Sequence, residues 1–250
     1  MAGLEKYNFS DEDDEWYFEE HVNGAEAFKE SSSNLKGDVT FWVETFGGRD
    51  NADFTKPKKF QEKAFDYFIE NSVEVFDSLC EGILAGYPKI MEEHGVTEYS
   101  EYYGFPELKS AFDVKNIISI GAVHILGEEK DGFGYIGIQG ECPWDPEHGF
   151  GMVMHQKRVL GIGDADTAFS NNMDIILKDI MTEEEWKAYN EETEKHRASH
   201  RANYEREQEE LRQLEFDESD TIALAKFREE MRQEALENKS GAKKWWEFWK

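Results

Sequence analysis

The sequence predicts an α+β fold, in which an antiparallel β-meander is covered by a long amphipathic helix and followed by a charged helical extension. Between about Pro57 and Ala85, apolar residues recur at three- and four-residue spacing, the period of a helix with one buried face. From Lys115 to Ile162 the apolar period changes to two, which is typical of strands. Beyond Thr182 apolar residues become sparse, which indicates helix with little burial.

The first 37 residues are acidic and weakly patterned, so we expect residues 1–37 to form an N-terminal segment ahead of the domain. Five consecutive carboxylates at residues 11–15 are typical of a solvated stretch. The first strand is predicted at residues 38–46, which are rich in β-branched and aromatic side chains. The α+β domain itself is expected over residues 38–180.

The long helix carries Cys80 on its apolar stripe, where the thiol is expected to act as a small buried side chain. Pro88 is predicted to end this helix, because proline lacks the backbone N–H that a helix interior needs. A short second helix is then expected to begin at Ile90 and to end near Gly95. Residues 99–105 follow as a connector that contains three tyrosines and a phenylalanine.

Four strands are predicted after this connector. The first, residues 116–126, is almost continuously apolar, which indicates burial on both faces. Asp131-Gly132 favours a hairpin turn, because both residues adopt positive φ at low cost. The returning strand is expected at residues 133–140, and strands at residues 151–155 and 158–162 complete an antiparallel meander.

The remaining chain is predicted to be helical. Residues 173–180 are expected to form a helix that packs on the domain, and residues 182–185 have the pattern of a capping box that begins a long charged helix. The acidic residues 217–220 break that helix and cap another. We expect residues 181–240 to form a helical hairpin or extension, either solvated or in coiled-coil contact with a second chain.

Residues 241–250 form a Trp-rich C-terminal peptide in which four large aromatic side chains lie between lysines. We expect these rings either to pack back on the body of the protein or to bind a partner protein. Contact with a membrane interface is a further alternative, which the acidic body disfavours. The candidate partner-binding residues are Trp245, Trp246, Phe248 and Trp249.

The protein has a formal net charge of −27, from 55 acidic and 28 basic residues. Such a surface repels nucleic acid and anionic lipid, so neither is expected as a ligand, whereas a basic protein partner is attracted. The sequence shows neither a signal peptide nor a run of about 18 to 20 apolar residues, so we expect a cytoplasmic protein. The two cysteines, Cys80 and Cys142, form no disulfide framework.

The most distinctive stretch is residues 142–151, Cys-Pro-Trp-Asp-Pro-Glu-His-Gly-Phe-Gly, between two predicted strands. One interpretation is a structural loop, in which the prolines fix the backbone and Trp144 fills the core. In such a loop Asp145 accepts backbone N–H groups in an Asx turn. Glu147 and His148 then form hydrogen bonds that hold adjacent strands together.

The same loop offers ligands for a metal ion, which is a second interpretation. The candidate ligands are Asp145, Glu147 and His148, with Asp164 and Asp166 on a second loop. This oxygen-rich set with one imidazole suits Mg²⁺, Mn²⁺ or Ca²⁺, or Zn²⁺ where the coordination is tetrahedral. The spacing of these residues matches no established metal-binding signature.

Covalent catalysis is a third interpretation, with Cys142 as the nucleophile beside His148 or His155. A cysteine followed by proline at the end of a strand lacks the helix N-terminus that commonly lowers a thiol pKa. The sequence therefore shows no complete catalytic constellation. It favours a non-enzyme, and we expect neither catalytic residues nor a cofactor.

Residues 142–151, together with the Gly-rich residues 161–169, resemble a family of uncharacterised bacterial domains. The pattern of that family is Cys-x-Trp-Asp-x-Glu-His-Gly-x-Gly, followed by a segment that ends in Asp-Thr-Ala-Phe. The resemblance covers about residues 38–180. It implies a domain of unknown function and a setting near bacterial toxin and antitoxin-like genes, and it supplies no catalytic residues.

We therefore expect a non-catalytic bacterial binding protein, of the immunity type that neutralises a basic toxin or another basic partner. The acidic excess complements such a partner and accelerates association. Two alternatives stay open. One is a metal-dependent hydrolase that uses Asp145, Glu147 and His148, and the other is an oligomeric scaffold or adaptor that makes its contacts through helices at residues 182–238.

Overall fold

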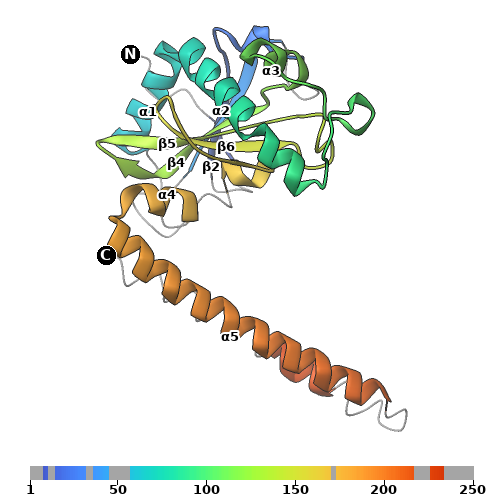
Figure 1. Cartoon of the computed structure of the whole chain (residues 1–250). Helices are drawn as coiled ribbons and strands as arrows, with labels where there is room; N and C mark the ends of the chain where they lie inside the picture. Colours follow the sequence, from blue (N-terminus) through green and yellow to red (C-terminus); the bar gives the residue numbers. More distant parts are fainter. Residues whose placement is uncertain are drawn as a thin grey trace. The chain divides into compact units, whose positions relative to one another are not determined.

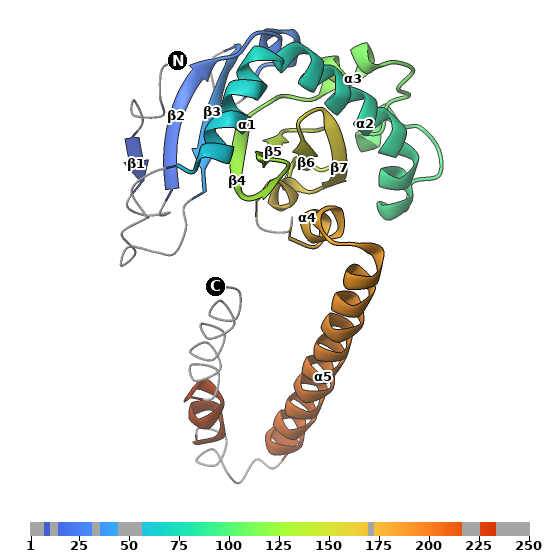
Figure 2. The same ribbon diagram turned by 90° about the vertical axis from the view of Figure 1, so that its left-hand side faces the viewer.

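The computed structural model describes residues 8–10, 15–31, 36–44, 57–169, 173–216 and 226–233 (Figures 1 and 2). Contacts within the chain divide it into two compact units, residues 1–183 and residues 184–250. The first unit combines one β-sheet with helices on both of its faces. The predicted α+β class is therefore confirmed.

Within the described residues the sheet has seven strands, and their order across the sheet follows their order in the sequence. The strands are β1 (Asn8–Ser10), β2 (Glu15–His21), β3 (Asp38–Val43), β4 (Ala122–Lys130), β5 (Phe133–Gly140), β6 (Phe150–His155) and β7 (Arg158–Gly163). Every neighbouring pair is antiparallel except β3 and β4, which run parallel. A parallel pair needs a crossover, and the helices between β3 and β4 form it. The predicted meander is confirmed from β4 to β7.

The N-terminal strands belong to the same sheet, although the sequence places them in an acidic segment ahead of the domain. Phe18 of β2 lies opposite Phe41 of β3, and the two rings stack with centroids 5.1 Å apart. Val22, Ala25 and Phe28, which follow β2, are buried as well. In the sequence, the many acidic residues of this segment mask the apolar residues that pack into the core.

Within its described residues, the crossover contains three α-helices. They are α1 (Lys59–Glu70), α2 (Ser72–Glu93) and α3 (Ala111–Ile117). The prediction of one continuous helix from about Pro57 to Ala85 is wrong, because the helix breaks at Asn71. The side-chain amide of Asn71 donates a hydrogen bond to the carbonyl oxygen of Tyr67 at 2.8 Å, which closes the end of α1.

Helix α2 continues through Pro88 to Glu93. The predicted stop at Pro88 and the separate helix from Ile90 are therefore wrong. Proline removes one helical hydrogen bond, but Tyr87 and Met91 on either side of it are buried. Packing of this last part of α2 against the core offsets the missing hydrogen bond.

The strand predicted from residue 116 begins later, at Ala122, because α3 occupies the first part of the apolar run. The hydroxyl oxygen of Ser110 accepts a hydrogen bond from the backbone N–H of Asp113 at 3.4 Å. The carboxylate of Asp113 in turn accepts one from the backbone N–H of Lys109 at 2.9 Å. These caps stabilise the start of α3. The first five residues of β4 are buried, as the apolar run predicts.

Helices lie on both faces of the sheet (Figure 2), and the buried side chains form two separate clusters. Helices α1 and α2 cover the larger core, where the ring of Phe41 meets Phe65 and Phe68 at centroid distances of 5.2 and 5.6 Å. The short helix η5 (Ala165–Ala168) and the predicted helix α4 (Met173–Ile180) lie on the other face. The buried residues of the smaller core are Leu126, Tyr135, Val153 and Ile176.

The second unit contains most of α5 (Glu183–Phe216), and residues 226–233 are helical as well. Helix α5 begins directly after Thr182, as the capping pattern predicts, and most of its described side chains are exposed. The charged helical extension is therefore confirmed. The predicted hairpin turn at residues 217–220 and the Trp-rich peptide, residues 241–250, lie outside the described residues. Among the helices that the structure describes, none combines the length and the apolar character needed to cross a bilayer.

Candidate functional site

The loop from Cys142 to Gly149 connects β5 to β6 and is closed by its own hydrogen bonds. The carboxylate of Asp145 accepts a hydrogen bond from the backbone N–H of His148 at 3.0 Å and lies 3.0 Å from the His148 Nδ1 atom. The carbonyl oxygen of Asp145 accepts the backbone N–H of Gly149 at 2.8 Å. Gly149 has a φ of 69°, which favours glycine. Asp145 and His148 are thus brought together, and they hold the turn.

Ionisation of Asp145 is favoured by this geometry. Partial burial opposes the charge, but the hydrogen bonds from the backbone and ring of His148, with the charges of His148 and His94, outweigh it. The pKa of Asp145 therefore lies below its usual value. Such a carboxylate is a stable hydrogen-bond acceptor for the turn and is a poor proton donor at neutral pH.

Trp144 and Pro143 fasten the loop to the helical side of the first unit. The ring of Trp144 is buried and meets the ring of Tyr87 of α2 edge to face, with centroids 5.7 Å apart. The Tyr87 hydroxyl donates to the carbonyl oxygen of Pro106 at 3.0 Å. A Cβ atom at Gly104 would lie 1.9 Å from the Pro143 carbonyl oxygen, so only glycine permits this backbone contact. The loop therefore supports the turn around residues 100–106.

Cys142, the first residue of this loop, is buried, and its sulfur lies 3.7 Å from the carbonyl oxygen of Asp145. Burial raises the pKa of the Cys142 thiol to about 12, so the thiol is protonated at neutral pH. His155, the other histidine considered for catalysis, has its Nε2 atom 3.0 Å from the carbonyl oxygen of Lys130. Burial likewise raises the pKa of Cys80 to about 12.

The second Gly-rich segment packs its backbone directly on the sheet. A Cβ atom at Gly137 would lie 1.7 Å from the carbonyl oxygen of Ala168, and one at Gly151 would lie 2.3 Å from that of Asp164. The backbone N–H of Ala165 donates to the carbonyl oxygen of His148 at 3.3 Å, which joins the two segments of the sequence motif. These glycines therefore let η5 lie against β5 and β6.

The predicted metal ligands are only partly brought together. The Asp164 carboxylate accepts a hydrogen bond from the Thr167 hydroxyl at 3.3 Å, while Glu147 and Asp166 are exposed. Within the described part of the chain, no group of three or more His, Cys, Asp or Glu side chains is arranged to hold a metal ion. Asp145 and His148 remain a pair.

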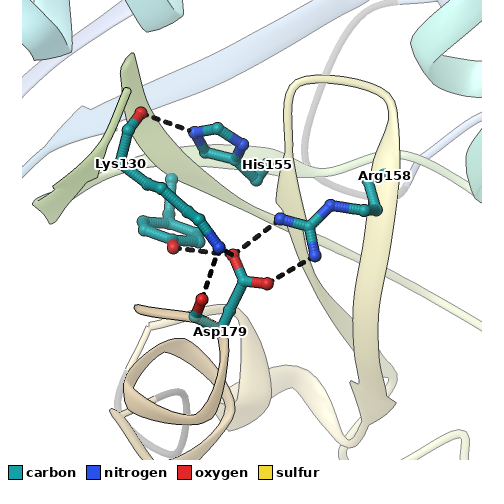
Figure 3. A network of polar contacts seen from close by, with 5 residues as sticks. Lys130, His155, Arg158 and Asp179 are labelled. Carbon is teal, nitrogen blue, oxygen red and sulfur yellow. Dashed lines mark hydrogen bonds and ion pairs between the residues drawn. The ribbon is translucent and has the colours of Figure 1, made fainter. Parts of the chain in front are cut away.

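A half-buried carboxylate, Asp179 of α4, forms a polar cluster that the sequence analysis missed (Figure 3). Its oxygens accept hydrogen bonds from the two terminal guanidinium nitrogens of Arg158 and from the Tyr135 hydroxyl, the latter at 2.8 Å. The Lys130 ammonium group lies 3.1 Å from the same carboxylate and also contacts the Asp179 carbonyl oxygen. These residues come from four elements at irregular spacing, so no local pattern identifies them.

The Arg158 hydrogen bonds, followed by those of Tyr135 and Lys130, hold the pKa of Asp179 far below its usual range against the effect of burial. Burial, and then the hydrogen bond to Asp179, raise the pKa of Tyr135. A fixed carboxylate beside a protonated phenol does not exchange protons at neutral pH. The cluster instead attaches α4 to β4, β5 and β7.

Two carboxyl groups lie where β3 ends and β4 is irregular. The Glu44 carboxylate accepts the backbone N–H of Gly127 at 2.6 Å, and the buried amide of Gln61 donates to the Glu44 carbonyl oxygen at 2.8 Å. Burial raises the pKa of Glu44, and the hydrogen bond from Gly127 partly offsets this. Burial and the nearby charge of Glu44 raise the pKa of Glu128 to about 7. Glu128 therefore titrates near neutral pH.

The C-terminal end of α2 and the following connector form an exposed surface, residues 88–103, which we call the tyrosine surface. The side chains of Tyr99, Tyr102 and Tyr103 are 54%, 90% and 69% exposed. Tyr102 and Tyr103 lie in the short helix η4 (Glu101–Tyr103). Backbone hydrogen bonds between Ser100 and Phe105 close the turn around η4, and buried Phe105 anchors it from inside.

A groove of about 540 Å³ lies on this surface. Its lining includes Pro88, Met91, Glu92, Val96, Glu98 and Tyr99. The basic residues nearby are in ion pairs, since Lys89 pairs with Glu93 at 3.2 Å and Lys109 with Glu107 at 2.9 Å. Within the described residues, no lysine or arginine forms an ion pair with Glu92, Glu98 or Glu101. The sequence shows the aromatic connector, but it does not show that these tyrosines are exposed.

A family model described as "Domain of unknown function (DUF6985)" matches residues 7–169. The chain belongs to this family. The match begins earlier than the expected residue 38 and ends before the expected residue 180. It spans the seven strands that the structure describes, the loop from Cys142 and the tyrosine surface. It ends ahead of α4, so Asp179 lies outside the matched segment. Searches of curated proteins and of solved structures give no match.

Proposed function

We propose that this protein is a non-catalytic binding protein that holds a basic protein partner on its tyrosine surface. The observation that carries the proposal is the gathering of three exposed tyrosines beside three carboxylates that have no cationic partner among the described residues. Tyrosine is enriched at protein interfaces because its ring is apolar and its hydroxyl is polar. Exposed aromatic side chains gathered in this way are typical of an interaction site.

Electrostatics favour a basic partner. The net charge of −27 gives the whole protein a field that attracts a positively charged protein and repels an acidic one. Complementary charge accelerates association and excludes wrong partners. The tyrosines then supply the apolar contact area that long-range attraction alone does not provide.

The distinctive loop from Cys142 has a supporting role in this proposal. Trp144 packs on Tyr87, and Pro143 touches Gly104, so the loop braces the turn that carries the tyrosines from behind. A rigid turn binds with a smaller loss of conformational entropy than a mobile one. Loop residues whose types suggest catalysis in the sequence would then contribute to recognition indirectly, by supporting the turn.

The resemblance described above adds a finer proposal. A bacterial origin near toxin and antitoxin-like genes would make this an immunity-type protein, whose partner is a basic toxin. An acidic protein that covers the nucleic-acid-binding face of a basic toxin needs no catalytic group. The large charge excess is consistent with that role.

The two alternatives stay predictions. For the metal-dependent hydrolase, elemental analysis of the purified protein and of His148→Ala should show a stoichiometric metal that the substitution removes. For the oligomeric adaptor, deletion of residues 182–250 should abolish assembly and leave the rest folded. The hydrogen bonds that close the loop around Asp145 give little support to the metal-dependent hydrolase. The tyrosine surface gives more support to the binding protein.

The proposal is tested by finding the partner and measuring its charge dependence. The immobilised full-length protein is presented with an extract of the cells that encode it, and the retained protein is purified and remixed at known concentrations. We expect a basic protein that binds with 1:1 stoichiometry, and an association rate that falls at least about tenfold as the salt concentration rises to about 0.5 M. A retained partner that is acidic, or an association rate independent of salt, contradicts the proposal.

A further inference from the structure

We propose that the groove at the C-terminal end of α2 receives an apolar side chain of the partner, with a lysine or arginine of the same segment beside it. This inference rests on the proposed function and identifies which part of the tyrosine surface makes the specific contact. The occupant is a short basic segment of a protein with one exposed apolar side chain. The groove recognises this segment through apolar lining residues together with nearby carboxylates.

The shape of the groove follows from the way α2 ends. Gly95 has a φ of 69°, and the backbone N–H of Val96 donates to the carbonyl oxygen of Met91 at 2.8 Å. This is a Schellman ending, which folds the chain back across the last turn of the helix. The groove lies between that turn, with Pro88 and Met91, and the returning segment, with Val96 and Tyr99. Because backbone hydrogen bonds fix both sides, the groove is present without a partner.

The size and lining of the groove suit an apolar side chain. Its volume of about 540 Å³ lies within the range of about 300 to 1,000 Å³ that is typical of ligand sites. Pro88, Met91 and Val96 contribute apolar side chains to the lining, and the half-exposed ring of Tyr99 contributes an aromatic one. An anchor side chain that enters such a pocket loses its contact with water and contributes strongly to affinity.

The carboxylates at the groove favour a positively charged side chain of the partner. Glu92 and Glu98 line the groove, and Glu101 follows in η4, while the two nearby lysines are already paired with other glutamates. An acidic segment would meet three like charges there. The exposed rings of Tyr102 and Tyr103 add a second attraction, because an aromatic face binds an ammonium or guanidinium group.

Three peptides of the same length test this inference. The first is Lys-Lys-Trp-Lys-Lys, the second replaces Trp by Ala, and the third is Glu-Glu-Trp-Glu-Glu, all with blocked ends. Each is titrated into the isotopically labelled full-length protein, and amide chemical shifts are followed by NMR. We expect saturable shifts confined to residues 88–103 with the first peptide, and affinities at least about fivefold weaker with the second and third.

Two variants then test the groove itself. Glu92→Gln with Glu98→Gln removes only charge and should weaken the first peptide about fivefold, since each exposed ion pair contributes little. Thr97→Arg places a bulky cation at an exposed lining position and should abolish the shifts. The matched control, Glu191→Gln with Glu192→Gln on exposed turns of α5, should bind like the wild type.

Several results overturn the inference. They are the absence of saturable shifts, shifts that map elsewhere, equal binding of the acidic peptide, or unchanged binding by both groove variants. The same variants are also measured with the captured partner. If that partner binds them as it binds the wild type, the groove is not the docking site although the proposed function stands. If no basic partner is captured at all, the proposed function fails, whatever the peptides do.

Discussion

The loop from Cys142 and the tyrosine surface lie side by side in the first unit, yet their side chains are used in opposite ways. In the loop, Asp145 is hydrogen-bonded by His148, and Trp144 is buried against Tyr87. On the surface, Tyr102 is 90% exposed and three carboxylates have no cationic partner among the described residues. Side chains whose interactions are satisfied within the fold stabilise it, whereas unsatisfied ones remain available to another molecule.

This contrast predicts that the loop affects stability and that the surface does not. We expect Trp144→Ala to lower the free energy of unfolding by about 3 to 5 kcal/mol, because it leaves a cavity against Tyr87. Tyr102→Ala should change it by less than about 0.5 kcal/mol, because that ring is exposed. Urea denaturation of both variants measures the difference. Equal losses of stability in the two variants contradict the distinction.

A second carboxylate with hydrogen-bonded partners is that of Asp179, which itself lies outside the matched family segment. Asp179→Ala should cost about 3 kcal/mol, because Arg158 and Lys130 lose their common anion. The folded-state pKa of Asp179 is lowered, so this contribution is present above the unfolded-state pKa of about 3.9 and is lost as the pH falls further. The difference between wild type and variant, measured by denaturation from pH 7 to pH 2, should therefore shrink in acid. The exposed Lys178→Ala on the same helix is the control, and an equal loss there would refute the assignment.

Glu128 is expected to change the free energy of unfolding with the opposite pH dependence. Its folded-state pKa is raised to about 7, above the unfolded-state value of about 4.3, so stability is full below about pH 4.3 and is lost as the pH rises towards 7. Glu128→Gln has no charge to bury and should be more stable than the wild type by about 1 to 3 kcal/mol at pH 8, but not at pH 4. Thermal unfolding at the two pH values measures this. A variant of exposed Glu129 should show no such gain, and a gain in both would exclude burial as the cause.

The smallest effect is expected at Glu147, a motif residue whose side chain is exposed. Glu147→Ala should change the free energy of unfolding by less than about 0.5 kcal/mol and leave partner binding unchanged. The measurement is urea denaturation together with titration of the captured partner. Loss of a stoichiometric metal or of an enzymatic activity in this variant would instead favour the hydrolase alternative.

The fold class follows from the sequence because periodicity and charge are local properties. Two of the errors about helices arise where tertiary packing or a helix cap outweighs the signal on which the prediction rested. Pro88 lies inside α2 because Tyr87 and Met91 are buried, and the apolar run from residue 116 is divided because Ser110 caps α3. The N-terminal strands were hidden by their acidic outward side chains, although Phe18 stacks on Phe41.

The site was harder to predict than the fold. Residues 142–151 are conspicuous in the sequence, but whether they bind metal or hold a turn depends on distances that spacing does not give. The Asp179 cluster draws on four separate elements, so no sequence window contains it. The sequence predicts a connector that contains these tyrosines, but it does not predict their exposure, because aromatic side chains are more often buried. The exposure of Tyr102 and Tyr103 follows from the turn that Ser100 and Phe105 close.

The most direct test of the central claim is the dissociation constant of the captured partner for Tyr102→Ala with Tyr103→Ala. Tyr204→Ala, which removes an exposed tyrosine from α5, is the control. We predict that the double substitution weakens binding at least about tenfold, leaves the unfolding free energy unchanged, and that the control binds like the wild type. Undiminished binding by the double variant would contradict the claim that the tyrosine surface holds the partner.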